Sequence, residues 1–298
     1  MTVVLLAGIA VVDFVFSVDA MPRRAEKHRA RDAAIVGGGC AANAAVTVAR
    51  LGGTARLAAR VGADPIGDMI ISGLLDEAVD CSLVKRFEGK RSSFSSVFVD
   101  RQGERQIVNF RDETLSFEAD WLEQAMPESF DAALADVRWP KGGAAALRAA
   151  RLLSRPGVLD AEPPIAEAAE ALMLASHIAF SAQGLRDHSG LDDLEAALRL
   201  AQTRTDAWIC CTDGADGVTF LEDGALRRVP AFAVEAVDTL GAGDVWHGAF
   251  ALALGEGSSE YEAAVFANAV AAMKCTRFGG RAGIPTRAET DEFMRQRR

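Results

Sequence analysis

Apolar strand-like runs alternate regularly with helix-like runs along most of this chain. Between residues 132 and 211, short apolar segments such as 132–137, 177–180 and 207–211 are separated by longer helical stretches. Because two parallel strands can be joined only by a crossover, such alternation indicates a parallel sheet with helices on both faces. The 298 residues therefore predict an α/β fold, a three-layer αβα sandwich built on a mostly parallel central sheet.

Two stretches near 11–36 and 83–110 interrupt this alternation because they lack helical periodicity. The second contains Asp100-Arg101-Gln102-Gly103 between extended segments, which is a hairpin signal. Neither a repeat nor a long linker divides the chain. We therefore predict one domain over residues 1–298, with these two stretches forming a small β-sheet lid.

The charge balance and the cysteine content narrow the range of partners. Lys plus Arg number 32 and Asp plus Glu number 42, which gives a net charge of −10. An acidic protein is repelled by nucleic acid and by anionic membranes, so we expect neither as a partner. The five cysteines form no C-x-x-C pair, which indicates reduced thiols. The apolar N-terminus lacks a basic region and is too short to span a bilayer, so we predict a cytoplasmic protein.

A turn rich in small residues leads directly into a helix near the C-terminal end of the chain. Its sequence is Asp238-Thr239-Leu240-Gly241-Ala242-Gly243-Asp244. Backbone N–H groups of residues 241–243 can converge there, and the helix N-terminus adds partial positive charge. This predicts an anion hole for a transferring phosphoryl group, with Asp244 as acceptor of a hydroxyl proton. At a helix N-terminus that carboxylate is expected to be acidic. A capped helix with a glycine-rich entry is the structural alternative.

A second glycine-rich turn, Gly37-Gly38-Gly39, precedes an alanine-rich helical stretch that ends at Leu51-Gly52. Residues without side chains let a ligand approach the backbone. Asn43, one turn into the helix, can form hydrogen bonds with vicinal hydroxyls. The turn also matches G-x-G-x-x-A, so an NAD(P)-dependent Rossmann enzyme is an alternative. That pattern normally carries an acid about 20 residues later, whereas the next strand here ends Arg60-Val61-Gly62.

A segment and a single residue are candidates for the site only in combination with these two turns. Thr212-Asp213-Gly214-Ala215-Asp216-Gly217 follows an apolar strand, and it is either a plain Asp-Gly turn or a loop on the nucleotide side of a site. Asp13 stands five residues after Gly8, near the end of the first strand. It either caps a turn or holds sugar hydroxyls.

The two glycine-rich turns together resemble the signatures of the PfkB, or ribokinase-like, carbohydrate kinases, and the resemblance extends from Gly8 to Asn268. It implies an αβα sandwich with a β-sheet lid, ATP as phosphoryl donor and Mg²⁺ as cofactor. By this resemblance the base is Asp244, and the anion hole is formed by Gly241, Ala242 and Gly243. The sugar lies against Asp13, Gly38, Gly39 and Asn43. The nucleotide lies near Thr212, Gly214, Gly217 and Asn268.

The resemblance also raises two questions about cations. Several relatives bind K⁺ beside the anion hole, which here implies a monovalent cation at Asp238 and the loop carbonyls of 274–283. Many members carry an Asn-x-x-Glu motif that supports Mg²⁺ and phosphate. At that place this chain has Ser181-Ala182-Gln183-Gly184. Metal handling must then depend on water or on other groups.

A closer resemblance, to the sulfofructose kinases, is carried by the strings at 134–139, 179–181, 243–249 and 274–285. Those enzymes phosphorylate C1 of 6-deoxy-6-sulfofructose. The Lys, Asn and Arg with which they hold the sulfonate are matched here by Lys27, Asn109 and Arg138. Arg138 also follows a predicted strand, at the edge where such sheets bind ligands.

These observations predict an ATP-dependent kinase acting on the C1 hydroxyl of a ketohexose with an anionic C6 group. Fructose 6-phosphate and tagatose 6-phosphate present a similar oxyanion, so they stay open as substrates. A kinase for a neutral sugar or a nucleoside also stays open, as does a non-catalytic sugar-binding protein. The exposed edges of a small lid sheet favour pairing, so we expect a homodimer through the lids.

Overall fold

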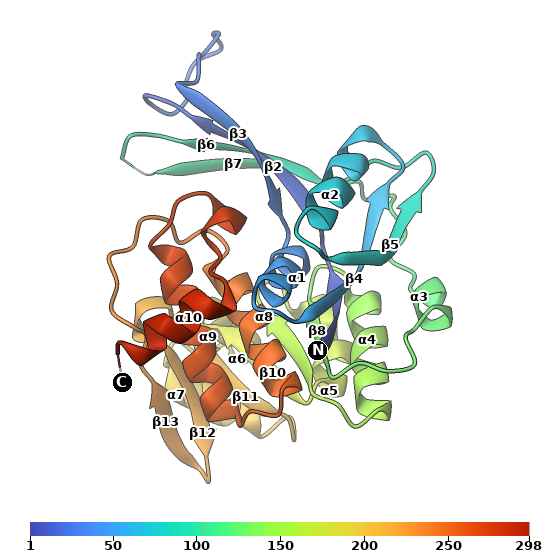
Figure 1. Cartoon of the computed structure of the whole chain (residues 1–298), viewed down its shortest axis with the longest axis vertical. Coiled ribbons are helices and arrows are strands. Elements are labelled where there is room, and N and C mark those ends of the chain that lie inside the picture. The colour runs from blue at the N-terminus through green and yellow to red at the C-terminus, as the bar shows by residue number, and fades with distance from the viewer. Residues whose placement is uncertain (103, 298) are drawn as a thin grey trace.

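The computed structural model describes residues 1–102 and 104–297, and its largest element is a nine-stranded sheet (Figure 1). The strand order is β13-β12-β11-β10-β9-β8-β1-β4-β5, and only the pairs formed by β12 are antiparallel. The strands are β1 (Val3–Gly8), β4 (Thr54–Gly62), β5 (Asp80–Phe87), β8 (Ala132–Asp136), β9 (Gly157–Ala161), β10 (His177–Ser181), β11 (Trp208–Thr212), β12 (Val218–Glu222) and β13 (Ala225–Val229). The predicted mostly parallel sheet is confirmed.

Helices cover both faces of this sheet, as predicted for a three-layer sandwich. One layer contains α1 (Cys40–Arg50), α2 (Pro65–Leu75), α8 (Ala242–Gly255) and α9 (Glu260–Cys275), with α10 (Arg287–Arg295) packed on α9. The other contains α3 (Asp120–Gln124), α4 (Pro140–Leu152), α5 (Ala169–Leu174), α6 (Ala182–Ser189) and α7 (Leu194–Gln202). Within the described ranges, no helix has both the length and the apolar character needed to cross a membrane.

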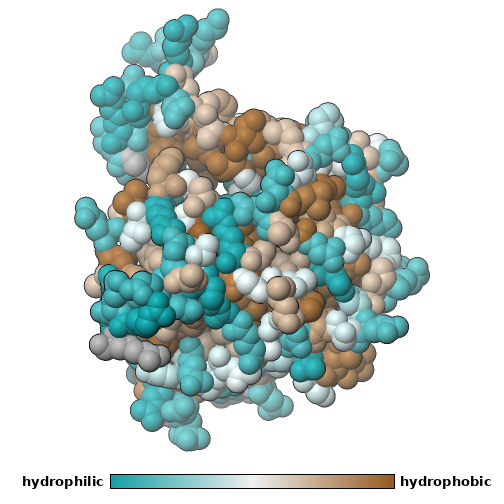
Figure 2. All heavy atoms as spheres, viewed as in Figure 1, coloured by the Kyte–Doolittle hydropathy of each residue, from teal (hydrophilic) through white to brown (hydrophobic). Residues whose placement is uncertain are grey.

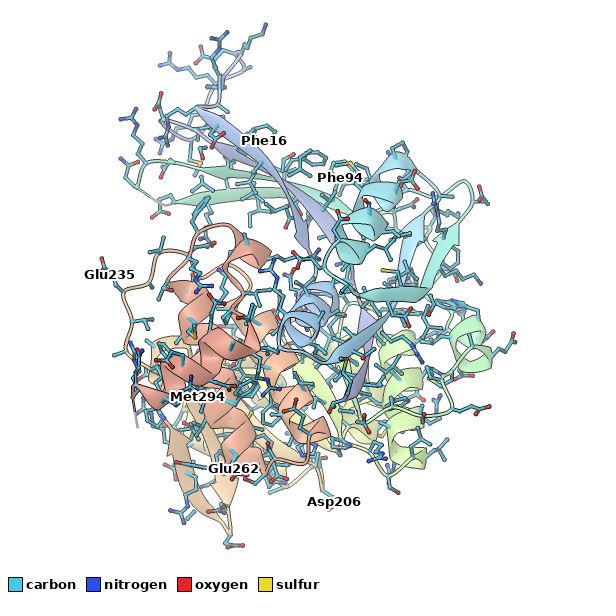
Figure 3. The ribbon with its side chains drawn as sticks, viewed as in Figure 1. Phe16, Phe94, Asp206, Glu235, Glu262 and Met294 are labelled. Carbon is cyan, nitrogen blue, oxygen red and sulfur yellow. The ribbon has the colours of Figure 1, made fainter. Side chains whose placement is uncertain are left out.

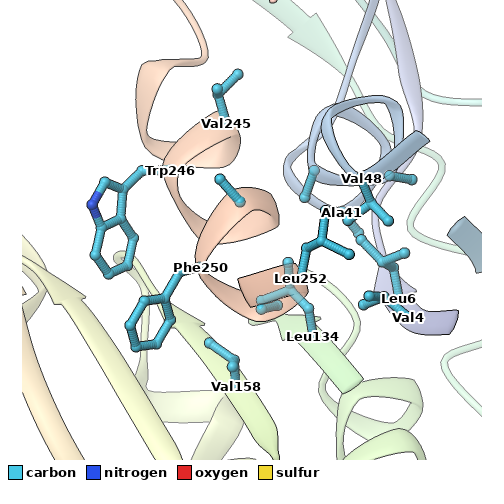
Figure 4. Close-up of a cluster of buried hydrophobic side chains, with 14 of the residues drawn as sticks. Val4, Leu6, Ala41, Val48, Leu134, Val158, Val245, Trp246, Phe250 and Leu252 are labelled. Carbon is cyan, nitrogen blue, oxygen red and sulfur yellow. The ribbon is translucent and has the colours of Figure 1, made fainter. Parts of the chain in front are cut away.

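The core explains why the first strand is continuously apolar. Val4 and Leu6 pack with α1 and α8, and Leu134, Trp246 and Phe250 belong to the same cluster (Figure 4). Leu5 and Ala7 point to the opposite face, where they pack against α4. Because successive side chains of a strand face opposite layers, a strand buried on both faces has no polar alternation.

A separate four-stranded sheet forms the lid, with the order β3-β2-β6-β7. Its strands are β2 (Val11–Ser17), β3 (Asp32–Gly38), β6 (Phe94–Val99) and β7 (Arg105–Phe110). Aromatic pairs hold it together. Phe16 stacks on Phe98 with ring centroids 5.5 Å apart, and Phe94 contacts Phe14 and Phe110. Figure 3 shows Phe16 and Phe94 on the lid. The small sheet extends over the large one and projects beyond it (Figure 1).

One boundary of the predicted lid is wrong. Residues 83–87 belong to β5, which pairs in parallel with β4 at the edge of the large sheet. Leu83 is buried and Val84 packs against the main core, so this segment is fixed by the body. The lid part of the second segment begins at Phe94. Gly103 lies outside the described residues.

Candidate active site

The N-terminus of α8 points to the edge where the parallel strands end. Gly241 precedes the helix with φ of 74°, a left-handed conformation that favours glycine. The N–H of Ala242 donates to the carbonyl of Thr239 at 3.2 Å. The N–H groups of Gly243 and Asp244 have no acceptor inside the helix, because they belong to its first turn. Gly243 and Asp244 are thus the backbone donors best placed to meet an anion.

The structure brings the two glycine-rich turns together. The side-chain amide of Asn43 on α1 donates to Oδ2 of Asp244 on α8 at 2.7 Å, although the two residues are 201 positions apart. Gly39, before α1, has φ of 95°, and a Cβ there would lie 2.4 Å from the carbonyl oxygen of Ile9. No other residue type fits this turn without moving the backbone.

The expectation of a low pKa for Asp244 is wrong. Burial raises its pKa to about 6, and the negative charge of Glu162 adds to the rise. The hydrogen bond from Asn43 lowers it by a smaller amount. Desolvation outweighs the helix N-terminus here, because the carboxylate is removed from water. A carboxylate of this kind is a better resting base than an exposed aspartate.

Arg281 is a site residue that the sequence reasoning missed. It lies in the 3₁₀ turn Gly280–Gly283 and is only 9% exposed. Its Nε donates to Oδ1 of Asn43 at 2.8 Å, and its terminal nitrogen donates to the carbonyl of Gly38 at 3.0 Å. Arg281 therefore orients the amide of Asn43, which in turn binds Asp244. Its membership in a glycine- and arginine-rich string near the C-terminus was the one available signal.

Asp136, at the end of β8, was also missed as a site residue. It is 2% exposed and accepts hydrogen bonds from three backbone N–H groups. These belong to Ile9 (2.8 Å), Ala41 (3.1 Å) and Arg138 (2.8 Å). This one carboxylate therefore fixes the end of the first strand, the start of α1 and the backbone at Arg138. In the sequence, an aspartate that follows an apolar strand looks the same whether it is buried or exposed in a turn.

Acidic groups gather around Asp244 at the ends of the central strands. Sγ of Cys40 and carboxylate oxygens of Asp160 and Asp244 all lie within 4.8 Å of one another. Asp160 is 3% exposed, and among the described residues its buried Oδ1 has no hydrogen-bond partner. Burial and the charge of Glu162 raise its pKa well above the usual range. Burial also raises the pKa of Cys40, so that group remains a thiol.

The lid contributes a row of polar side chains. Asp13 on β2 is the register partner of Ser95 on β6, and Ser95 is the partner of Asn109 on β7. Directly paired residues point to the same face of a sheet, so the predicted residues Asp13 and Asn109 share a face. Burial raises the pKa of Asp13, while its hydrogen bond with Ser95 and the charge of Arg281 lower it. Gly38 is buried beside Asp13.

Arg138 and Lys27 lie in different surroundings. Arg138 follows β8 at the C-terminal edge and is partly exposed. Burial raises the pKa of Asp136 and of Asp160, and the charge of Arg138 offsets a small part of both rises. Lys27 is exposed in the segment between β2 and β3, which projects from the far end of the lid (Figure 1). The structure therefore does not bring Lys27 to Arg138 within one chain.

The residues predicted near the nucleotide lie beyond β11. Thr212 ends that strand and its hydroxyl donates to the carbonyl of Phe180 at 3.3 Å. Gly214 begins the short 3₁₀ turn that follows and is exposed, and Gly217 comes directly after this turn. Asn268 is different, because it is 5% exposed. Its amide donates to the carbonyls of Val229 and Pro230, both at 3.1 Å, and its Oδ1 accepts from Trp246 at 2.8 Å. That geometry gives Asn268 the role of fixing the chain after β13.

The predicted cation position beside Asp238 contains a side chain. The ammonium of Lys274, on α9, donates to the carbonyl oxygen of Asp238 at 2.7 Å. It also lies 3.3 Å from Oδ2 of the same residue. Arg105 of the lid forms an ion pair with Oδ1 at 3.1 Å. Asp238 therefore connects the lid, the turn before α8 and the end of α9.

This combination of a mostly parallel sheet, a lid and a partly buried carboxylate in a glycine-rich helix N-terminus defines the class of ribokinase-like phosphotransferases. The family model for pfkB family carbohydrate kinases matches residues 1–287, and the chain belongs to that family. The match leaves the NAD(P)-dependent and non-catalytic alternatives without support.

Individual relatives agree with the family. A ribokinase of Haemophilus influenzae is 30% identical, and the match covers 95% of each chain. A fructokinase of Oryza sativa is 28% identical over 86% of this chain and 88% of its own. Among solved structures, a protein of Agrobacterium tumefaciens that is provisionally assigned as a ribokinase superposes with a TM-score of 0.89. It is 37% identical and covers 99% of this chain and 98% of its own.

Proposed function

We propose that this protein transfers the γ-phosphate of ATP to the C1 hydroxyl of a ketohexose that carries an anionic group at C6. The observation that carries the proposal is the position of Asp244. It sits in the first turn of α8, with Asn43 bonded to it at 2.7 Å and a pKa raised to about 6. A base and an anion-binding backbone turn thus occupy one point, as in-line transfer requires.

The roles of the protein groups follow from their positions. Asp244 takes the hydroxyl proton as the oxygen attacks phosphorus, and Asn43 holds its carboxylate in place. N–H groups at the start of α8 stabilise charge on the transferring phosphoryl oxygens. Asp13 and Asn109, on one face of the lid, bind the sugar from the other side. The lid also excludes water, which competes with the sugar as acceptor.

Asp160 and Glu162 are the groups best suited to hold Mg²⁺. The test is Oδ1 of Asp160, which is buried and accepts no hydrogen bond within the described parts of the chain. Nε2 of His247 lies 3.6 Å from it, but burial lowers the pKa of that imidazole, so the carboxylate still calls for a cation. Oxygen donors suit Mg²⁺, whereas the neutral thiol of Cys40 does not. Glu162 directly follows β9, and β9 pairs with β10, the strand after which the Asn-x-x-Glu motif is missing. When bound, Mg²⁺ neutralises negative charge on the ATP phosphates.

Asp160→Asn and Glu162→Gln test this assignment. Each variant should need more Mg²⁺ to reach half of its maximal rate. Direct titration of Mn²⁺ onto the ATP complex, followed by electron paramagnetic resonance, gives a readout that does not depend on turnover. Unchanged metal affinity in both variants would remove these two residues from the role.

The C6 anion is assigned to Arg138, with Asn109 as a neutral partner. A guanidinium can donate two parallel hydrogen bonds to a sulfonate or a phosphate. Sulfofructose is the substrate we favour, and fructose 6-phosphate and tagatose 6-phosphate carry the same kind of oxyanion. Lys27 reaches that group only if the segment between β2 and β3 moves or another copy of the chain presents it.

An ATP-coupled rate assay with fructose, fructose 6-phosphate, tagatose 6-phosphate and sulfofructose tests the substrate. Arg138→Ala should lower kcat/KM for the anionic sugar by about 10- to 100-fold, because hydrogen bonds to charged groups contribute roughly 1.5–3 kcal/mol. It should leave fructose nearly unaffected. Equal losses for both sugars would make Arg138 structural, and a preference for a neutral sugar or a nucleoside would select the corresponding alternative.

The lid also supports a homodimer. Ile35 on β3 and Ile107 and Val108 on β7 are more than half exposed, and both strands are edges of the small sheet. Hydrophobic residues extend along the lid behind its hydrophilic tip (Figure 2). Pairing of two lids covers both the apolar residues and the open edges. We further propose a reducing, cytoplasmic location, since all five cysteines are free.

A further inference from the structure

Lys274 is a fully buried lysine. Its side chain is 0% exposed, in the last turn of α9. Lysine is almost never buried without a partner, because removing an ammonium from water is costly. Its partners are the carbonyl oxygen of Asp238 at 2.7 Å and Oδ2 of the same residue at 3.3 Å. Both belong to the residue at which the turn before α8 begins.

Asp238 ties together three parts of the site. Its Oδ1 accepts from the N–H of Leu240 at 3.0 Å and from Arg105 of the lid at 3.1 Å. Its Oδ2 accepts from the N–H groups of Gly279 and Gly280, both at 3.2 Å. Burial alone would raise the pKa of Asp238, but these N–H groups and the Lys274 charge hold it below its usual value.

The loop with Gly279 and Gly280 continues directly to Arg281, which orients Asn43 and hence Asp244. In the other direction, Leu240 leads within three residues to Gly243. Asp238 therefore positions both the base and the anion hole, and the positive charge of Lys274 stabilises Asp238. Without it, the buried carboxylate of Asp238 would keep, among the residues that the structure describes, only Arg105 as a cation, and Arg105 is one-third exposed.

We propose that the Lys274 ammonium is a built-in monovalent cation for the turn 238–243, so that the kinase reaches full rate without added K⁺. The inference rests on the phosphotransferase activity of the family and on no particular sugar. Lys274 is a positioning residue, because it acts through Asp238 and contacts neither the sugar nor the base. The chain thus supplies from α9 the charge that the resemblance assigned to an external ion.

The first test uses the wild-type enzyme, freed of K⁺, Na⁺ and NH₄⁺ in a tetramethylammonium buffer. At a constant ionic strength of about 0.15 M, replacing tetramethylammonium by K⁺ should leave kcat unchanged. Activation by K⁺ in the wild-type enzyme would overturn the proposal. This result does not depend on the identity of the sugar, since any accepted sugar reports it.

The second test uses Lys274→Ala, which removes the ammonium that contacts Asp238 and opens space there. Misplacing a catalytic turn by a small distance can reduce the rate about 100-fold, so kcat should fall by about 10- to 100-fold with little change in KM. K⁺, NH₄⁺ or methylammonium should restore part of the rate, and tetramethylammonium should not. The matched control is Lys141→Ala, which removes an exposed ammonium on α4 and should behave as wild type in every buffer.

Thermal unfolding separates this proposal from the assignment of the substrate. K⁺ should raise the Tm of Lys274→Ala but not that of the wild type, because only the variant has a vacant cation position. Should the alanine variant fail to fold, Lys274→Ser, whose short side chain also leaves the cation position open, replaces it in both measurements. Two results would overturn the proposal. One is a variant whose kcat without added cations equals that of the wild type. The other is a variant whose Tm and kcat do not change with any of the cations.

Discussion

The edge of the large sheet and the lid differ in how their polar side chains are buried and hydrogen-bonded. At the sheet edge the polar groups are buried or partly buried and are bonded to the protein. Asp136 accepts from three N–H groups, and Arg281, Asn43 and Asp244 form a chain of hydrogen bonds. In the lid two of the predicted ligands, Lys27 and Asn109, are exposed, and Asp13 is partly buried. The edge fixes the geometry that chemistry needs, whereas the lid offers groups that only a substrate can satisfy.

This contrast implies that substitutions of the hydrogen-bonded residues at the edge reduce the rate with every sugar, whereas Arg138, partly exposed at the same edge, affects the choice of sugar. Substitutions of exposed lid residues should instead change the choice of sugar. The predictions that follow test that division, starting with the largest expected effect.

Asp244→Asn should have the largest effect. It keeps the shape of the side chain and removes the proton acceptor, and general-base catalysis is typically worth about 10²–10⁴-fold. We expect kcat to fall by at least that factor with every sugar, while ATP binding measured by calorimetry is retained. A variant with near-normal kcat would exclude Asp244 as the base.

The same variant should be more stable than the wild type near neutral pH. The folded-state pKa of about 6 lies above the ordinary value of 3.8, so ionisation destabilises the folded protein as pH rises between these values. Removing the charge should therefore increase the free energy of unfolding by roughly 1–3 kcal/mol at about pH 7, and by little at about pH 4. Urea unfolding at both pH values measures the difference.

Gly243→Val should fold but transfer little phosphate. A Cβ at Gly243 would have Oε1 of Glu162 as its nearest neighbour, at 3.7 Å, which is ordinary contact. The added branch would instead occupy the space in front of the helix N-terminus, and losing one donor of such a hole costs about 10²–10³-fold in kcat. Gly73→Val, on α2 with open space around it, is the matched control. If the Gly243→Val enzyme were active, the turn would serve only to begin the helix and would not bind the phosphoryl group.

Arg281→Gln should lower kcat by about 10- to 100-fold, because it releases Asn43 and so misplaces Asp244. Loss of a nearby cation should also move the acidic limb of the pH–rate profile upward. The control is Arg277→Gln, in the same loop, whose partner is Glu289. A change in stability without a shift of the pH profile would make Arg281 purely structural.

The pH dependence of the wild type tests the sheet edge without a mutation. Since Asp244 must be deprotonated to act, kcat/KM should fall as pH decreases through about 6. A cation bound by Asp160 and Glu162 moves this limb to lower pH, so raising Mg²⁺ should shift it downward. A limb near pH 4 at all Mg²⁺ concentrations would indicate an ordinary, solvated aspartate.

The smallest effect is expected for Lys27→Ala. In one chain Lys27 is exposed and far from Arg138, so its loss should change kcat/KM for the anionic sugar by roughly twofold, within the range of ordinary surface substitutions. Fructose should show no change. A loss of tenfold or more, confined to the anionic sugar, would mean that lid movement or a second copy brings Lys27 to the C6 group.

Much of this protein follows from local sequence patterns. Strand and helix periodicity is local, and it was sufficient to predict the parallel sheet, the two helical layers and most of the lid. The strings 37–43 and 238–244 pointed to Asn43 and Asp244, because glycine-rich turns before helices have a chemical meaning that does not depend on the rest of the chain. The boundary at 83–87 was wrong, because an edge strand of either sheet has the same extended pattern.

What only the tertiary structure decided is the electrostatics of the site. The pKa of Asp244 depends on how far water is excluded and on Glu162, which lies 82 positions earlier in the chain. Arg281 and Lys274 look like ordinary surface cations in the sequence, yet one orients Asn43 and the other neutralises Asp238. Burial and charge pairing arise from contacts between distant segments. The sequence by itself therefore determined where the chemical groups stand along the chain, and folding determined their protonation and their partners.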